Sequence, residues 1–150
     1  MSNSCAFSGH RDLYGTGFDY ALLERVIKDL VKLGTDRFLC GMAAGFDMCA
    51  AEAVLSLKKR YKIKLVACIP CANQTEKYSG FARQRYEKIL SKCDEKIVLS
   101  AYYYPGCMHE RNRYMVDNCD SVVCFLRKDS GGTFYTVNYA RKYNKTIIEL

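Results

Sequence analysis

The chain has 150 residues, of which 49% are hydrophobic and 26% charged, and these values are typical of one globular domain. The formal charge of +7 is compatible with binding to nucleic acid or to small phosphorylated ligands, and it does not decide between them. Because no apolar run reaches the length of a membrane span and no signal peptide opens the chain, we expect a cytoplasmic protein with no membrane partner.

The nine cysteines are scattered along the chain and form no recognisable metal-binding pattern. Cys68 and Cys71 are a C-x-x-C pair, but no second pair stands at zinc-ribbon spacing and no histidine cluster completes a site. Others, such as Cys5 and Cys124, lie in apolar runs, where cysteine behaves as a small hydrophobic residue. We therefore expect reduced structural thiols and no bound metal.

The chain begins with a short strand, a helix and a second strand. Ser4 to Ser8 is the first strand candidate and ends in Gly9-His10-Arg11. Asp19 can cap a helix whose apolar residues recur at 3.6-residue spacing, and Gly34 suits the end of that helix. Arg37 to Cys40 is the second strand candidate.

The middle of the chain repeats this alternation. A glycine-rich turn from Gly41 to Asp47 leads into a helical pattern. Lys64 to Pro70 follows as a third strand, and Tyr78 to Cys93 has a helical pattern with a basic, polar outer face. Lys96 to Ser100 is a fourth strand.

The last third supplies two more helices and two more strands. Pro105 to Cys119 has a helical apolar rhythm, and Ser121 to Leu126 is a short apolar run that suits a strand buried on both faces. A helix follows Gly131-Gly132-Thr133, and Thr146 to Leu150 is the last strand. The sequence thus predicts a single α/β domain over residues 1–150, a three-layer sandwich with a mostly parallel sheet of about six strands.

Three glycine-rich corners are expected at the carboxyl edge of this sheet, where open parallel sheets bind their ligands. They follow the first, second and fifth strands. Free backbone N–H groups and helix dipoles at such corners favour a phosphate. The residues that we expect to approach or contact a ligand there are Gly9, His10, Arg11, Gly41, Ala44, Gly45, Asp47, Gly131, Gly132 and Thr133.

Several side chains near these corners allow two roles. His10 can bond a ligand phosphate or tie down the first loop, and Asp47 can cap its helix or accept from a ribose hydroxyl. Thr133 suits both the N-cap of the last helix and a phosphate contact. Arg111 and Asn112, one element upstream, are expected in the pocket, where Arg111 and Arg11 neutralise phosphate charge.

Two common nucleotide-binding motifs are absent. The G-x-G-x-x-G fingerprint is met only in part, by Gly15-Thr16-Gly17, and no Walker A sequence occurs. These absences argue against ordinary NAD-dependent oxidoreduction and against P-loop NTP hydrolysis.

Five separated motifs together resemble the YpsA-like branch of the SLOG superfamily, which also includes the DprA/Smf DNA-processing proteins and the Lonely guy phosphoribohydrolases. The motifs are SGHR, GMAAGFDMCAAE, CIPCANQ, ERNRYMVDNCD and GGTFYTVNYA, and they extend from about Phe7 to Ala140. The resemblance implies a Rossmann-like fold with a pocket for a nucleotide or a nucleotide-derived ligand, such as ADP-ribose or a nucleoside monophosphate. It also implies a homodimer.

The run Met108-His109-Glu110-Arg111 is similar to the M-H-E-R run of the Lonely guy enzymes, which cleave the N-glycosidic bond of nucleoside 5′-monophosphates. This resemblance implies Arg111 as a catalytic candidate, with Glu110 as a second one. Asn138 stands where the glutamate of those enzymes falls, Ser130 replaces their proline, and Phe134 takes the place of a later glycine. Glycosidic cleavage needs help to the leaving group or water, which that glutamate would supply.

Three hypotheses for function follow. The first is a nucleotide-binding module with a sensing or regulatory role and no catalysis, which the missing glutamate favours. The second is a hydrolase of nucleoside 5′-monophosphates similar to the Lonely guy enzymes. The third is a DNA-binding protein of DprA character, and we rank nucleic acid below a small phosphorylated nucleotide as the partner.

Overall fold

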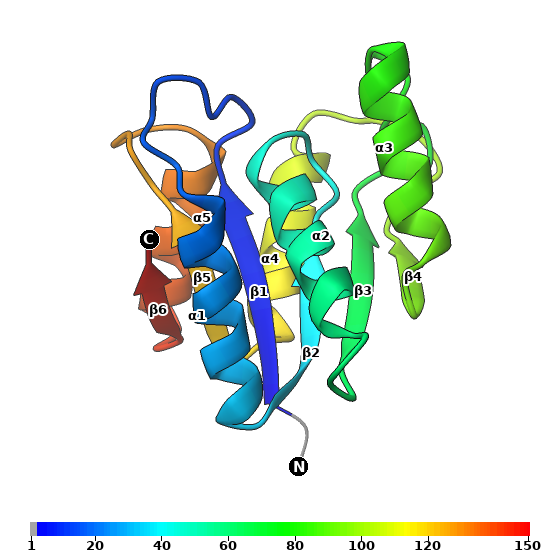
Figure 1. Ribbon diagram of the computed structural model, residues 1–150. Helices are drawn as coiled ribbons and strands as arrows, with labels where there is room; N and C mark the ends of the chain where they lie inside the picture. Colours follow the sequence, from blue (N-terminus) through cyan, green and yellow to red (C-terminus); the bar gives the residue numbers. More distant parts are fainter. Residues whose placement is uncertain (1–2) are drawn as a thin grey trace.

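Strands and helices alternate along residues 3–150, the part of the chain that the computed structural model describes (Figure 1). Within these residues lie six strands and five helices. In chain order they are β1 (Asn3–Gly9), α1 (Tyr20–Lys32), β2 (Thr35–Cys40), α2 (Phe46–Leu57), β3 (Lys64–Ile69), α3 (Gly80–Ser91), β4 (Glu95–Val98), α4 (Cys107–Asp117), β5 (Ser121–Phe125), α5 (Gly132–Lys142) and β6 (Thr146–Glu149). Among the described helices, none has the length and apolar character needed to cross a bilayer.

The six strands form one parallel sheet in the order β4-β3-β2-β1-β5-β6. The chain starts near the middle at β1, builds outward to β4, and then returns through α4 to the other side of β1. The direction of building therefore reverses between β1 and β5, whose pairing runs from Cys5–Ser121 to Gly9–Phe125. In open α/β sheets, ligands bind beyond the carboxyl ends of the strands at such a switch point.

The helices cover both faces of the sheet and make a three-layer sandwich (Figure 1). Helices α1, α2 and α3 pack on one face, and α4 and α5 pack on the other. This division follows from right-handed crossovers, because the direction in which successive strands are added decides the face that each connecting helix covers. Every residue of β5 is buried, as expected for a central strand covered on both sides.

The predicted fold class is confirmed, and the sheet is parallel throughout. The cap at Asp19 is also present, since its Oδ1 accepts from the N–H of Ala21 at 3.0 Å. The helix expected from Tyr78 begins instead at Gly80, because the Ser79 hydroxyl accepts from the N–H of Ala82 at 3.2 Å and caps it there. The fourth strand likewise lies slightly earlier than expected.

The end of β1 packs unusually closely on the start of α2. Phe46, the first residue of α2, is fully buried, and its ring stacks on that of Phe125 with 6.2 Å between centroids. A Cβ on Gly9 would lie 2.3 Å from Cγ of Phe46, closer than atoms can approach without rearrangement. Glycine at position 9 is therefore what permits the approach of β1 to α2.

We predict that Gly9→Ala lowers the free energy of unfolding by roughly 1–3 kcal/mol, the usual cost of overpacking a core. The matched control is Gly80→Ala, at the first position of α3, where an added Cβ would meet nothing within 4 Å. This control should be neutral or stabilising by up to about 1 kcal/mol. Urea denaturation of the three proteins measures both effects, and equal midpoints for wild type and Gly9→Ala would contradict the prediction.

Candidate functional site

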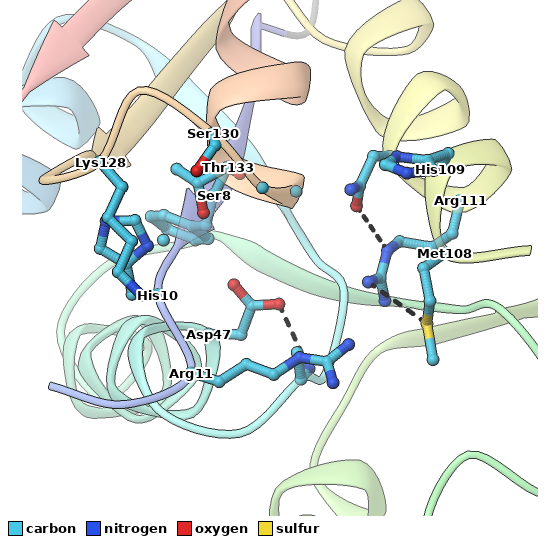
Figure 2. Close-up of a pocket in the computed structure, with 16 residues that line it drawn as sticks. Ser8, His10, Arg11, Asp47, Met108, His109, Arg111, Lys128, Ser130 and Thr133 are labelled. Carbon is cyan, nitrogen blue, oxygen red and sulfur yellow. Dashed lines mark hydrogen bonds between the residues drawn. The ribbon is translucent and has the colours of Figure 1, made fainter. Parts of the chain in front are cut away.

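A cavity of about 270 Å³ opens at the carboxyl edge of the sheet, at the switch point between β1 and β5 (Figure 2). Its walls come from the end of β1, from the loops after β1, β2 and β5, and from the N-terminal parts of α2, α4 and α5. The lining residues are Phe7, Ser8, Gly9, His10, Arg11, Ala43, Asp47, Met108, His109, Arg111, Asn112, Lys128, Ser130, Gly131, Gly132 and Thr133.

The three helices that supply the cavity with residues of their first turns have glycine N-caps. These glycines are Gly45, Gly106 and Gly131, and none gives its helix a side-chain cap. By contrast, Asp19 and Ser79 cap α1 and α3, whose first residues do not line the cavity. The first N–H groups of a helix have no partner inside the helix. The first N–H of α2 donates to the carbonyl of His10, and the first N–H of α4 donates to the carbonyl of Tyr104. The cavity is therefore bordered by three helix N-termini without a capping side chain, and the start of α5 has no such backbone bond within residues 3–150.

Arg111 links α4 to the loop between β2 and α2. Its side chain is buried, with 4% of the residue exposed, and its Nη1 donates to the carbonyl of Gly41. The Nε donates to Oδ1 of Asn112 at 2.7 Å, and the Nη2 lies 3.9 Å from the sulfur of Met108. A Cβ on Gly41 would lie 2.7 Å from the guanidinium. Glycine at position 41 thus makes room for the arginine.

The loop that follows Gly41 is held in a strained conformation. Met42 is fully buried, and its backbone has φ of 61°, in the left-handed region that residues other than glycine rarely adopt. Its carbonyl accepts from the Tyr78 hydroxyl at 3.2 Å, and the adjacent carbonyl of Gly41 accepts from the amide of Gln74 at 3.0 Å as well as from Arg111. Such strain persists where surrounding contacts fix the backbone, and here three side chains do so.

Asp47 is the carboxylate of the cavity. It lies in the first turn of α2 with 7% of the residue exposed, and its Oδ2 accepts from the N–H of Ala43 at 3.2 Å (Figure 2). Burial raises its pKa to about 6, although the nearby charges of Arg111 and Arg11 and the bond from Ala43 act in the opposite direction. Its other oxygen accepts no hydrogen bond from residues 3–150.

His10 lies at the end of β1 and joins two loops. Its Nε2 accepts from the N–H of Arg127 at 2.8 Å, which requires that nitrogen to carry no proton and the imidazole to be neutral. Burial and the charges of Lys128 and Arg127 lower its pKa, so the neutral form is favoured near pH 7. His10 therefore ties the loop after β1 to the loop after β5, and it also lines the cavity.

Most residues expected at the site lie around this cavity, but three glycine-corner residues do not. These are Gly41, Ala44 and Gly45, which are not among the residues that line it. The role of Gly45 is close packing, since a Cβ there would lie 2.2 Å from the carbonyl oxygen of Arg11, and its φ is 79°. Glu110 is also outside the cavity, where it accepts from the Tyr104 hydroxyl.

Two capping roles considered for the sequence are wrong. Asp47 does not cap α2, because the helix begins at Phe46 after Gly45, and the carboxylate instead holds the N–H of Ala43. Thr133 does not cap α5, because Gly131 occupies the N-cap and Thr133 is the second helical residue. In both corners a glycine is the N-cap, two residues before the polar residue, so each helix begins earlier than a cap at Asp47 or Thr133 would place it.

The cavity is also lined by side chains that we do not predict from the sequence. Lys128 and Ser130 lie in the loop between β5 and α5. Their position just before the predicted corner residue Gly131 is the one feature of the sequence that indicates a place near the ligand. Met108 and His109 come from the first turn of α4, and the His109 ring lies 4.3 Å from that of Tyr135. Nothing in the local sequence indicates that this turn faces α5.

The cysteines and the acidic residues make no cluster suited to a metal ion within residues 3–150. All nine cysteines are free thiols. Cys68 and Cys71 are buried, and burial raises the pKa of the Cys68 thiol to about 12, which keeps it protonated and unreactive near pH 7.

We predict that Asp47→Asn stabilises the fold at neutral pH. The pKa of Asp47 is about 6 in the folded state and 3.8 in a model carboxyl, so its contribution to stability is largest below pH 3.8 and is lost as pH rises to about 6. Relative to wild type, the variant should gain roughly 2.5 kcal/mol between about pH 4 and pH 7.5. Urea denaturation at both pH values measures this gain, and a difference between the two proteins that does not change with pH would refute it.

The chain is similar to a known family and to known proteins. The YpsA family model (YspA SLOG family) matches residues 18–148. The uncharacterized SPbeta prophage-derived protein YoqJ of Bacillus subtilis is 31% identical over 134 residues, which cover 80% of this chain and 78% of YoqJ. A UPF0398 protein of Halalkalibacterium halodurans is 28% identical over 123 residues, which cover 79% of this chain and 65% of that protein.

Two solved structures of DNA processing protein A share the fold. The protein from Streptococcus pneumoniae superposes with a TM-score of 0.73 and 21% identity, over 99% of this chain and 50% of its own. The protein from Helicobacter pylori, which binds single-stranded DNA, superposes with a TM-score of 0.70 and 21% identity, over 98% of this chain and 64% of its own. This chain therefore spans about half to two thirds of those proteins.

The family assignment does not depend on these distant structural likenesses. The family model covers most of the chain, including the three helices α2, α4 and α5 that border the cavity. The chain therefore belongs to the YpsA family of SLOG proteins.

Proposed function

We propose that the cavity binds the phosphate of a nucleotide or nucleotide-derived ligand and that the protein acts as a sensing or regulatory module. The observation that carries this proposal is the set of helix N-termini at the cavity, which lack side-chain caps while the two helices away from it have them. Backbone N–H groups and the positive end of the helix dipole favour a phosphate at such a place. We place the phosphate at Gly131 to Thr133.

The side chains of the cavity support a phosphate of this kind. Arg11, Arg111 and Lys128 supply positive charge from three separate elements. Ser8 and Thr133 also line the cavity, and each carries a hydroxyl that can donate to a phosphate oxygen.

A hydrolase of nucleoside 5′-monophosphates is the second candidate, and one observation favours it. Asp47 places a carboxylate in the same cavity as Arg111, which could serve in place of the missing glutamate. Glu110 and Asn138 do not line this cavity, and Asp117 accepts from the Tyr139 hydroxyl at 2.8 Å. Among the described lining residues, Asp47 is thus the sole carboxylate for such chemistry.

The binding proposal is tested by thermal unfolding with AMP, ADP-ribose and inorganic phosphate. A ligand at 100 times its Kd should raise the Tm by roughly 5–10 °C, from a stabilisation of about 2.7 kcal/mol. Gly132→Val should abolish this shift, because its side chain would occupy the phosphate position at the first residue of α5. Gly80→Val is the matched control, since Gly80 is the first residue of α3 and, like Gly132, has open space around its Cβ position.

The outcome that would contradict the proposal is a full shift in Gly132→Val. A single-stranded oligothymidylate is included because the Helicobacter pylori protein that shares the fold binds single-stranded DNA. Affinity for it that falls steeply with salt and survives Gly132→Val would favour a DNA-binding role elsewhere on the surface.

We predict no catalysis in this cavity. Incubation with AMP, GMP, CMP and UMP should release no free base above the rate in buffer, because the motif glutamate of the glycosidic hydrolases is replaced by Asn138. Chromatography of the free base measures this. Release that is lost in Asp47→Asn would instead establish the hydrolase and assign its carboxylate.

A further inference from the structure

A second cavity, of about 390 Å³, adjoins the first one. The two share Arg11 and Met108, which form the boundary between them. The other walls of the second cavity come from the loop between β3 and α3 and from Tyr103 in the loop before α4. The two cavities therefore lie side by side, with Arg11 and Met108 between them.

The second cavity has the surfaces that a planar, hydrogen-bonding group needs. The rings of Tyr78 and Tyr103 and the thioether of Met108 offer apolar surface. Glu76 and Lys77 add polar groups at the same cavity, while the amides of Asn73 and Gln74 are bonded within the wall. The wall is held in place, since the N–H of Tyr103 donates to Oδ1 of Asn73 at 3.1 Å. Stacking of a nucleobase on aromatic side chains uses such surfaces and tolerates different bases.

The carboxylate of Asp47 requires an explanation in a cavity that is otherwise cationic. A phosphate would be repelled by it, and burial of its charge is unfavourable. Only one of its oxygens is used, by the N–H of Ala43, and the other is open to the cavity (Figure 2). A fully ionised phosphate has no hydrogen to donate to this oxygen, whereas a sugar hydroxyl does and adds no charge to the cavity.

We propose that the ligand is a ribonucleotide that spans both cavities, with its sugar hydroxyls donating to Asp47 and its base between Tyr78 and Tyr103. This assignment rests on the proposed phosphate site at α5 and extends it to the rest of the ligand. The order along the two cavities is then phosphate at Gly132, sugar at Asp47 and base beyond Arg11. The site distinguishes ribose from 2′-deoxyribose because the deoxy sugar leaves the buried carboxylate without one donor.

The test compares AMP, dAMP and ribose 5-phosphate by titration calorimetry. Wild-type protein should bind AMP at least tenfold more tightly than dAMP, and Asp47→Asn should reduce this preference to below about threefold. Asp29→Asn is the matched control, because it removes the same charge from the exposed surface of α1 and should keep the preference. Equal affinities of the wild type for AMP and dAMP would overturn the assignment of Asp47.

The second cavity is tested with Tyr103→Ala, whose side chain lies on an exposed loop, with 59% of the residue accessible. This variant should bind AMP roughly tenfold more weakly, because one stacking partner is lost, and should bind ribose 5-phosphate with unchanged affinity. If ribose 5-phosphate binds wild type as tightly as AMP does, the base does not occupy this cavity. Gly132→Val separates the two proposals. If this variant binds neither AMP nor dAMP, and wild-type protein binds both with equal affinity, the phosphate site is kept and the ribonucleotide assignment is rejected.

Discussion

The bond from the buried guanidinium of Arg111 to the carbonyl of Gly41 holds the functional edge of this protein together. It joins α4, on one face of the sheet, to the loop after β2, which leads into α2 on the other face. A buried charge is costly unless its hydrogen-bonding groups are satisfied, and Gly41 and Asn112 provide acceptors here. The absence of a side chain at Gly41 is part of the same arrangement. The position of Asp47 depends on this loop and therefore on α4.

The cavity combines positive groups with one buried carboxylate, and the pKa of that carboxyl is set by two opposing influences. Arg111 and Arg11 lower the pKa of Asp47, whereas burial raises it by a larger amount. The pKa of Asp47 therefore lies about one unit below neutral pH, so near pH 7 the carboxyl is ionised although little of the residue is exposed to solvent. Such an arrangement costs folding stability and is common where a binding site needs a charge at a fixed point.

The sequence was sufficient to predict the order of the elements and the fold class, because continuous apolar runs such as Ser121 to Leu126 are too short for a typical helix, whereas the helical segments show apolar residues at 3.6-residue spacing. It also placed Arg111 and the pair Gly131-Gly132 at the carboxyl edge, with support from the family resemblance. The helix starts at Asp47 and Thr133 were misplaced, because a glycine can begin a helix without a capping side chain and leave the polar residue inside the first turn.

Other features of the site could not be read from the sequence. The contribution of Lys128 depends on the path of the loop after β5, and that of His109 on the packing of α4 against α5. The second cavity depends on Tyr103 and on a loop about thirty residues earlier, held to it by the bond to Asn73. These contacts join residues that no local pattern relates, so only the assembled tertiary structure reveals them.

The left-handed backbone at Met42 has a consequence for recognition. A residue in this region costs on the order of 1–3 kcal/mol, and folding rather than binding supplies that energy. The loop that presents Ala43 and Asp47 is already ordered by Arg111, Gln74 and Tyr78 before any ligand arrives. An incoming molecule would then lose its own freedom without also having to order the protein, which is how preorganised sites reach useful affinity with few contacts.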